Sequence, residues 1–165
     1  MAAVVAILED DANRIREMRA CLEEVLPAAR NVFFEVAGEM CEWLGAHLGE
    51  VALISLDHDL PLRDGEGRRV DCGSGREVAD FLASMPPTCP VIVHSSNNYC
   101  APGMYFALKE GGWPVSRVCP MDDLAWVRRD WAARVMRYVR EGVARGVRLY
   151  ASWRVFAVAL IFGWR

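Results

Sequence analysis

The stretch Val51-Ala-Leu-Ile-Ser-Leu-Asp57-His58-Asp59-Leu60-Pro61 decides how the rest of the sequence is interpreted. A short apolar run, typical of a buried strand, ends in an acid, an imidazole and a second acid, and a proline then closes it. Open α/β sheets bind ligands at the carboxyl ends of their strands. Three titratable side chains in succession cannot lie unpaired in a core, so they line a cleft or hold a metal.

The composition is that of an ordinary soluble globule. With 165 residues, 53% hydrophobic and 25% charged, the chain suits one domain with a sizeable core. Its formal net charge of −3 excludes a global basic field that would attract nucleic acid. Six scattered cysteines without a CxxC pair are expected to be free thiols, and residues 1–8 lack the features of a signal peptide. We therefore expect a reducing compartment, the cytoplasm.

Apolar runs of strand length alternate with helical periodicity along the chain. Strands are expected at 3–8, 31–37, 51–56, 90–94 and 115–118, and helices at 12–25, around 40–48, 76–85, 102–110 and 121–143. Successive βα units joined by right-handed crossovers predict an α/β fold, a three-layer, doubly wound parallel five-stranded sheet. The order expected for its strands is 2-1-3-4-5, one of the two common doubly wound orders.

The folded domain is expected to span residues 1–146, followed by an apolar C-terminal extension at 147–165. The apolar core of the extension, 155–162, is much shorter than the roughly 18 residues of a membrane-spanning helix, so no membrane partner is expected. The favoured interpretation is a packed extra element or a contact with a second copy or a partner protein. A loosely ordered tail is the alternative.

Polar side chains follow three of the expected strands. Glu9, Asp10 and Asp11 follow the first strand, Asp57 follows the third and Ser95 follows the fourth. In the order 2-1-3-4-5 these three strands are neighbours, so their side chains should meet at one edge of the sheet. Hard oxygen ligands of this kind suit a divalent cation such as Mg²⁺.

At these residues the chain resembles the receiver domain of two-component response regulators, over roughly residues 3–145. The resemblance rests on the Asp10-Asp11 pair, on Asp57 followed by Pro61 and Asp64-Gly65, and on Ser95. It implies a receiver or flavodoxin-like fold, a Mg²⁺ or Mn²⁺ ion held by Asp10, Asp11 and Asp57, and a phosphoryl group accepted by Asp57 and sensed by Ser95.

Two departures from the receiver pattern are informative. Receivers carry a lysine before the proline that follows strand five, whereas this chain has Cys119-Pro120, with Cys119 expected to be a small buried residue. Two histidines are added, in Leu-Asp-His58-Asp-Leu and in His94-Ser-Ser-Asn97. This pair of motifs resembles the divergent branch called the cyclic-phosphate processing receiver domain.

That second resemblance implies a metal-assisted phosphoesterase acting on the cyclic phosphate of a nucleotide or an RNA end. Opening such a ring needs a base, an acid and neutralisation of charge on the phosphate oxygens. His58 and His94 are the expected base and acid, with Asp57 and Ser95 as the other catalytic residues. Substrate contacts are expected from Asp59, Asn97, Arg63, Arg68 and Arg69, with Arg76 beside them.

Each assignment has an alternative. The acids could form a structural ion-pair network with Arg14 or the loop arginines, without a metal. His58 could only cap the loop, because adjacent strand residues face opposite sides, and the same alternation separates His94 from Ser95. At the level of function, the alternative is a divergent signalling receiver, either phosphorylatable or a phosphorylation-independent interaction module.

Overall fold

The computed structural model describes residues 3–61, 66–68, 70–121 and 123–144, and the fold below refers to these residues. Arg63, Arg69 and the extension expected at 147–165 lie outside them. None of the described helices is both long and apolar enough to cross a membrane.

Five parallel strands form the sheet that the sequence predicts. They are β1 (Val4–Leu8), β2 (Arg30–Phe34), β3 (Val51–Leu56), β4 (Val91–His94) and β5 (Val115–Val118). Their order is β2-β1-β3-β4-β5, with every neighbouring pair parallel. The prediction of a doubly wound receiver-like sheet is confirmed.

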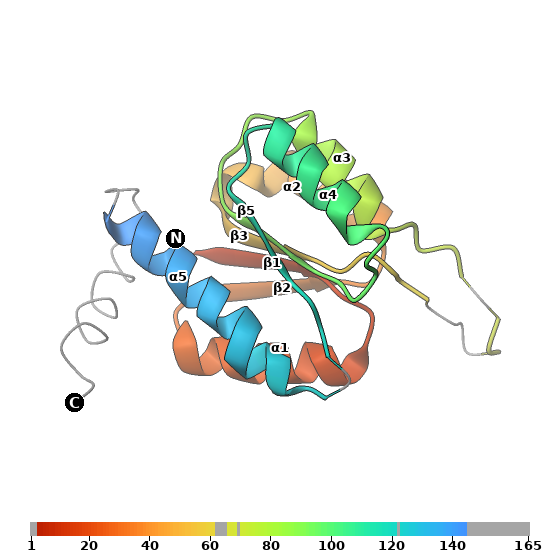
Figure 1. Ribbon diagram of the computed structural model, residues 1–165, viewed down its shortest axis with the longest axis horizontal. Helices are drawn as coiled ribbons and strands as arrows, with labels where there is room; N and C mark the ends of the chain where they lie inside the picture. Colours follow the sequence, from red (N-terminus) through yellow and green to blue (C-terminus); the bar gives the residue numbers. More distant parts are fainter. Residues whose placement is uncertain (1–2, 62–65, 69, 122, 145–165) are drawn as a thin grey trace.

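Helices cover both faces of the sheet (Figure 1). On one face lie α2 (Ala37–His47), α3 (Gly75–Ala83) and α4 (Ala101–Glu110), and on the other lie α1 (Ala12–Val25) and α5 (Ala132–Ala144). A 3₁₀ turn, Leu48–Glu50, leads from α2 into β3. Before α5 the chain makes one π-helical turn, Val127–Trp131, so the expected helix at 121–143 is not a uniform α-helix. Single π turns of this kind often accompany functional sites.

The alternation of side chains along the strands divides the core into two clusters. Ala6 and Leu8 of β1 pack in the cluster beneath α2, α3 and α4. Val5 and Ile7 pack in the other cluster, with residues of α1 and with Trp131. Because β1 is buried along its whole length, only the residues beyond its carboxyl end are free to meet a ligand.

The start of α3 is packed directly against the end of β3. The Gly75 N–H donates to the His58 carbonyl oxygen at 3.0 Å. A Cβ atom at Gly75 would lie 1.8 Å from the backbone oxygen of Asp57, which is impossible without a shift of the backbone. Ser74 and Glu77 form a capping box that starts the helix at this point. The glycine therefore lets α3 approach the residues on which the candidate site depends.

This close approach predicts opposite effects for two glycine substitutions. Gly75→Ala is expected to destabilise the fold by about 1–3 kcal/mol, the usual cost of forcing extra volume into a packed region. Gly45→Ala, inside α2 with nothing within 4 Å of the new Cβ, is expected to be neutral or to stabilise by about 0.5–1 kcal/mol. Urea denaturation of both variants measures the difference. Equal stability of the two variants would contradict the packing described for Gly75.

Candidate functional site

Three carboxylates meet at the carboxyl ends of β1 and β3. Glu9, Asp10 and Asp57 each offer one oxygen, and these oxygens lie within 4.8 Å of one another. Glu9 is 0% exposed and Asp57 3%. One oxygen of Glu9, Oε2, and one of Asp10, Oδ1, are buried without a hydrogen bond. A buried carboxylate oxygen without a hydrogen bond is costly, and a hard cation is a partner that carboxylates in this arrangement can accept.

Asp11 has a different role from its neighbours. Its Oδ1 accepts hydrogen bonds from the N–H groups of Asn13 at 2.8 Å and Arg14 at 2.9 Å, so it is the N-cap of α1. Within the described residues the cluster contains Glu9 where the sequence suggested Asp11. The sequence carried a signal for this: an acid immediately before a helical stretch is a favoured cap.

Arg14 brings a positive charge into the carboxylate cluster. Its Nη1 lies 2.9 Å from Asp57 Oδ2 and 3.3 Å from Glu9 Oε2, and its side chain is 25% exposed. The ion-pair network considered as an alternative is therefore present. It does not satisfy every oxygen of the cluster, because Asp10 Oδ1 keeps no partner.

The cluster shifts the pKa values of its members in opposite directions. Burial raises the pKa of Asp10 to about 6, and the neighbouring charge of Glu9 adds to the effect. Burial would also raise the pKa of Glu9, but the contacts with His94 and Arg14 outweigh it, and the pKa lies below its ordinary value. A bound cation would therefore favour the ionised form of Asp10, which burial disfavours.

His94 is buried in the core rather than exposed in a cleft. It is 0% exposed, and its Nδ1 lies 2.8 Å from Ser55 Oγ. Trp131 Nε1–H donates to that same oxygen at 2.9 Å, so the Ser55 hydroxyl can in turn donate to Nδ1. In this arrangement neutral His94 carries its proton on Nε2, which faces Glu9 Oε2 at 3.3 Å. His94 therefore contacts a carboxylate of the cluster, not solvent.

His58 lies on the opposite side of β3 and is held by Asp59. Its Nδ1 lies 2.7 Å from Asp59 Oδ1, and its side chain is 14% exposed. Burial opposes ionisation of Asp59, but the hydrogen bonds from His58 and Asn97 keep the pKa of this carboxyl below its ordinary value. An ionised carboxylate only accepts, so Nδ1 donates and the lone pair is left on Nε2.

Asn97 completes this chain of contacts. Its Nδ2 donates to Asp59 Oδ2 at 3.1 Å, and its Oδ1 accepts from the N–H groups of Tyr99 and Cys100 just before α4. Ser95 is 1% exposed, and its hydroxyl accepts from the Asn97 N–H at 3.2 Å. Asn97 and Ser95 thus fix the turn after β4 that orients Asp59 and, through it, His58.

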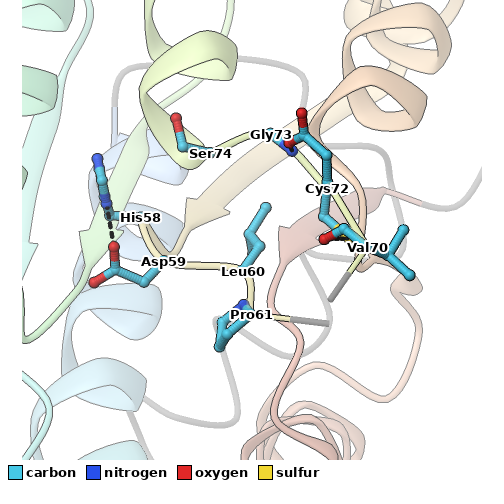
Figure 2. Close-up of a pocket in the computed structure, with 9 residues that line it drawn as sticks. His58, Asp59, Leu60, Pro61, Val70, Cys72, Gly73 and Ser74 are labelled. Atoms are coloured by element: carbon cyan, nitrogen blue, oxygen red, sulfur yellow. Dashed lines mark hydrogen bonds and ion pairs between the residues drawn. The ribbon is translucent and has the colours of Figure 1, made fainter. Parts of the chain in front are cut away.

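The two histidines do not share a cleft. His58 and Asp59 line a pocket of about 480 Å³ with Cys72, Gly73 and Ser74 (Figure 2). Figure 2 shows the His58–Asp59 pair on one side of this pocket, with Val70 and Cys72 on the other.

A second pocket, of about 430 Å³, lies over the carboxylate cluster and is lined by Asp10, Arg14 and Asp57, among others. Asp59 and Pro61 line both pockets, so the pockets are adjacent, but His94 lines neither of them.

The remaining predicted contacts lie further out. Arg68 is exposed and paired with Glu66 at 3.0 Å. Arg76 forms an i,i+4 pair with Asp80 on the surface of α3. Cys119, expected to be buried, is exposed. Sequence reasoning missed Ser55 and Trp131, which carry no signal of their own because one is an ordinary residue of a buried strand and the other of a helical turn.

Comparisons with known proteins agree with the fold. A family model described as "Cyclic-phosphate processing Receiver domain" matches residues 5–110. No curated protein matches the sequence significantly.

Among solved structures, the phosphorylated cyanobacterial phytochrome response regulator RcpA is 18% identical, with a TM-score of 0.65 over 84% of this chain and 95% of that one. The Mn²⁺-bound response regulator Rcp1 is 17% identical, with a TM-score of 0.58 over 79% and 90% of the two chains. The response regulator domain of Thermotoga maritima CheB is 16% identical, with a TM-score of 0.59 over 86% and 96%. Identities this low establish a shared fold and no more.

The raised pKa of Asp10 predicts that this residue destabilises the fold when it is ionised. Its folded-state value of about 6 exceeds the ordinary 3.8, so the native state binds more protons between these pH values. The contribution of Asp10 to stability therefore falls as pH rises through this window. Without divalent cations at pH 8, Asp10→Asn is expected to melt higher than wild type, by about 2–4 °C for each kcal/mol gained. The difference in melting temperature between Asp10→Asn and wild type should be smaller at pH 5.

Thermal denaturation at both pH values checks this expectation. The matched control is Asp123→Asn, which removes the same charge from an exposed position and should leave the melting temperature nearly unchanged. A lower melting temperature for Asp10→Asn than for wild type at pH 8 would contradict the account of the cluster.

The identity of the cation ligands can be tested by three substitutions of equal charge change. Mn²⁺ is expected to raise the melting temperature of the wild-type protein by mass action, and Glu9→Gln or Asp57→Asn should reduce this shift strongly. Asp11→Asn should retain it, because asparagine caps a helix about as well as aspartate. Equal losses for Asp11→Asn and Glu9→Gln would show that Asp11 is a ligand after all.

Proposed function

Because the chain belongs to the family of cyclic-phosphate processing receiver domains, we propose that it is a metal-assisted phosphoesterase that opens the cyclic phosphate of a nucleotide or an RNA end. The observation that carries the proposal is the oriented pair His58–Asp59, which lies beside a cluster of buried carboxylates. A signalling receiver has no need of an imidazole held in this way.

His58 is the residue suited to proton transfer. With Nδ1–H donated to Asp59, its Nε2 accepts a proton from the attacking water or, once protonated, delivers one to the leaving alkoxide. Asp59 holds the ring in this tautomer, and Asn97 holds Asp59. His58 can serve one of these two proton transfers in a given displacement, because the attacking and leaving oxygens lie on opposite sides of phosphorus.

The second requirement is neutralisation of the charge on the phosphate oxygens. Glu9, Asp10 and Asp57 are the residues that would hold Mg²⁺ or Mn²⁺, which would supply neutralisation of that charge when bound. Arg14 adds a permanent positive charge between Glu9 and Asp57. This charge matters because the chain has Cys119 at the position where receivers carry a lysine.

The role proposed for His94 changes with its burial. It is a positioning residue that orients Glu9 through Nε2 and is itself oriented by Ser55. Ser95 likewise supports the turn that carries Asn97. Substrate contacts are proposed for Asp59, which lines both pockets, and for Asn97, which is hydrogen-bonded to it. Arg63, Arg68 and Arg69, from the segment that follows Pro61, are proposed as further contacts.

The proposal predicts a sharp dependence of turnover on His58. His58→Ala should reduce hydrolysis of a 2′,3′-cyclic nucleotide roughly 10²–10⁴-fold, the usual contribution of one positioned acid or base. Asp59→Asn should reduce turnover by a smaller factor and move the limbs of the pH–rate profile. His47→Ala, which removes a histidine stacked on Trp43 in α2, is the matched control and should keep wild-type activity. Full activity of His58→Ala would exclude the proposed mechanism.

The second candidate function is a divergent response-regulator receiver that acts as a signalling or interaction module. It is favoured by the position of Asp57, a carboxylate at the end of β3 beside Asp10 and Arg14, where a phosphoryl group could be accepted. A small phosphodonor, or beryllofluoride with Mg²⁺, should then modify or occupy Asp57, with His58→Ala behaving as wild type. A stable aspartyl phosphate on Asp57 without consumption of any cyclic phosphate decides for this alternative.

The environment of the protein is also a proposal. All six cysteines are free in the structure, which supports a reducing compartment such as the cytoplasm. A homo-oligomer or a complex with a partner protein through residues 147–165 is proposed from the apolar composition of that extension alone.

A further inference from the structure

A pocket rich in arginine lies on the opposite edge of the sheet from β2. It has a volume of about 490 Å³ and is lined by residues of β5, of the π-helical turn and of α5. Four of its side chains are arginines, and one acid lies among them: Arg117, Arg129, Arg134, Arg137 and Asp130. It shares no lining residue with the two pockets of the candidate site.

Two of these arginines are neutralised and two are not. Arg129 pairs with Asp130 at 2.8 Å, and Arg137 lies 3.5 Å from Glu141. Arg117 and Arg134 are each partly buried. Among the residues that the structure describes, neither side chain has a hydrogen-bond or ion-pair partner. The Nε of Arg117 is a buried donor without an acceptor.

This arrangement is unfavourable unless an anion is present. The buried Nε donor of Arg117 carries a desolvation cost because it has no acceptor, and the neighbouring positive charges of the pocket repel one another. The overall composition does not explain the clustering, because the chain as a whole carries a formal charge of −3. Proteins normally bury a charge only where something pairs with it.

The geometry of the guanidinium group indicates which anion fits. Its planar fork of N–H donors matches pairs of phosphate oxygens, and bidentate contacts of this kind are the strong ones. The two unpaired guanidinium groups in this pocket, those of Arg117 and Arg134, suit a ligand with two adjacent phosphate groups. The volume lies in the range of small-molecule sites, about 300–1,000 Å³.

We propose that this pocket binds a small ligand carrying a pyrophosphate group, such as a nucleoside diphosphate or triphosphate, with Arg117 and Arg134 contacting its phosphate oxygens. The site is separate from the carboxylate cluster, and its occupancy does not depend on the phosphoesterase proposal.

The test is calorimetric titration of the full chain with inorganic pyrophosphate, at fixed salt and without divalent cations, so that the carboxylate cluster cannot recruit the anion. Wild type should bind, and Arg117→Gln and Arg134→Gln should each weaken binding at least about tenfold, as expected for the loss of a charged hydrogen-bonding partner. Arg140→Gln is the matched control, since Arg140 is an exposed arginine of α5 outside the pocket lining. It should change binding by less than about twofold, as expected for a screened surface charge.

Arg134→Gln keeps the experiment decisive even if Arg117→Gln does not fold, because position 134 is only partly buried on the helix. The proposal is overturned if wild type does not bind pyrophosphate. It is also overturned if Arg140→Gln weakens binding as much as Arg134→Gln, which would indicate a general charge effect. Binding of a single-stranded oligonucleotide without binding of pyrophosphate or ATP would likewise exclude a pyrophosphate pocket and indicate a strand-binding surface instead.

Discussion

The burial of the Glu9 carboxylate is the constraint on which the site depends. A fully buried carboxylate is tolerated only where donors and positive charge surround it. Its Oε1 accepts from the N–H groups of Asp10 and Asp11, at 3.1 and 3.0 Å, and its Oε2 lies 3.3 Å from both Arg14 Nη1 and His94 Nε2. One side chain therefore ties together the turn after β1, the first turn of α1 and the end of β4.

The polar contacts continue from Glu9 through the core to the helix on the far side. Glu9, His94, Ser55 and Trp131 form a chain in which each buried polar group faces the next. Trp131 belongs to the π-helical turn before α5, and Trp126 stacks over the His94 ring with centroids 6.1 Å apart. A buried polar chain of this kind specifies one arrangement, because removal of any member leaves its neighbours unpaired. The site and the start of α5 are thus structurally linked.

The two candidate functions use the same carboxylates and differ in what surrounds them. Arg14 supplies a positive charge from α1, whereas receivers supply one from a lysine at the end of β5. His58 faces away from the cluster into its own pocket, and Asp59 stands between the two. The proposed phosphoesterase would use both pockets, with the phosphate at the carboxylates and the leaving group at His58, whereas a signalling receiver would use the carboxylates alone.

Much of the fold was decided by the sequence alone, because its signals are local. The apolar runs and their helical neighbours specify a parallel, doubly wound sheet, and the order 2-1-3-4-5 follows from the resemblance to receiver domains; the structure confirms both. The meeting of acidic side chains at the carboxyl ends of β1 and β3, where Asp57 lies, was also predicted from the sequence and is present in the structure. The N-cap at Asp11 was also visible in principle, since capping depends on a few consecutive residues.

The assignments within the site were decided only by tertiary structure. Glu9 and Asp11 are both acids just after a strand, two positions apart, and which of them joins the cluster and which caps α1 depends on where β1 ends. His58 and His94 both follow strands, yet side-chain alternation sends His58 toward α3 and His94 toward Trp131. Ser55 and Trp131 carry no chemical signal in isolation. They acquire roles because the fold brings residues far apart in the chain within hydrogen-bond distance, and no local pattern encodes such distances.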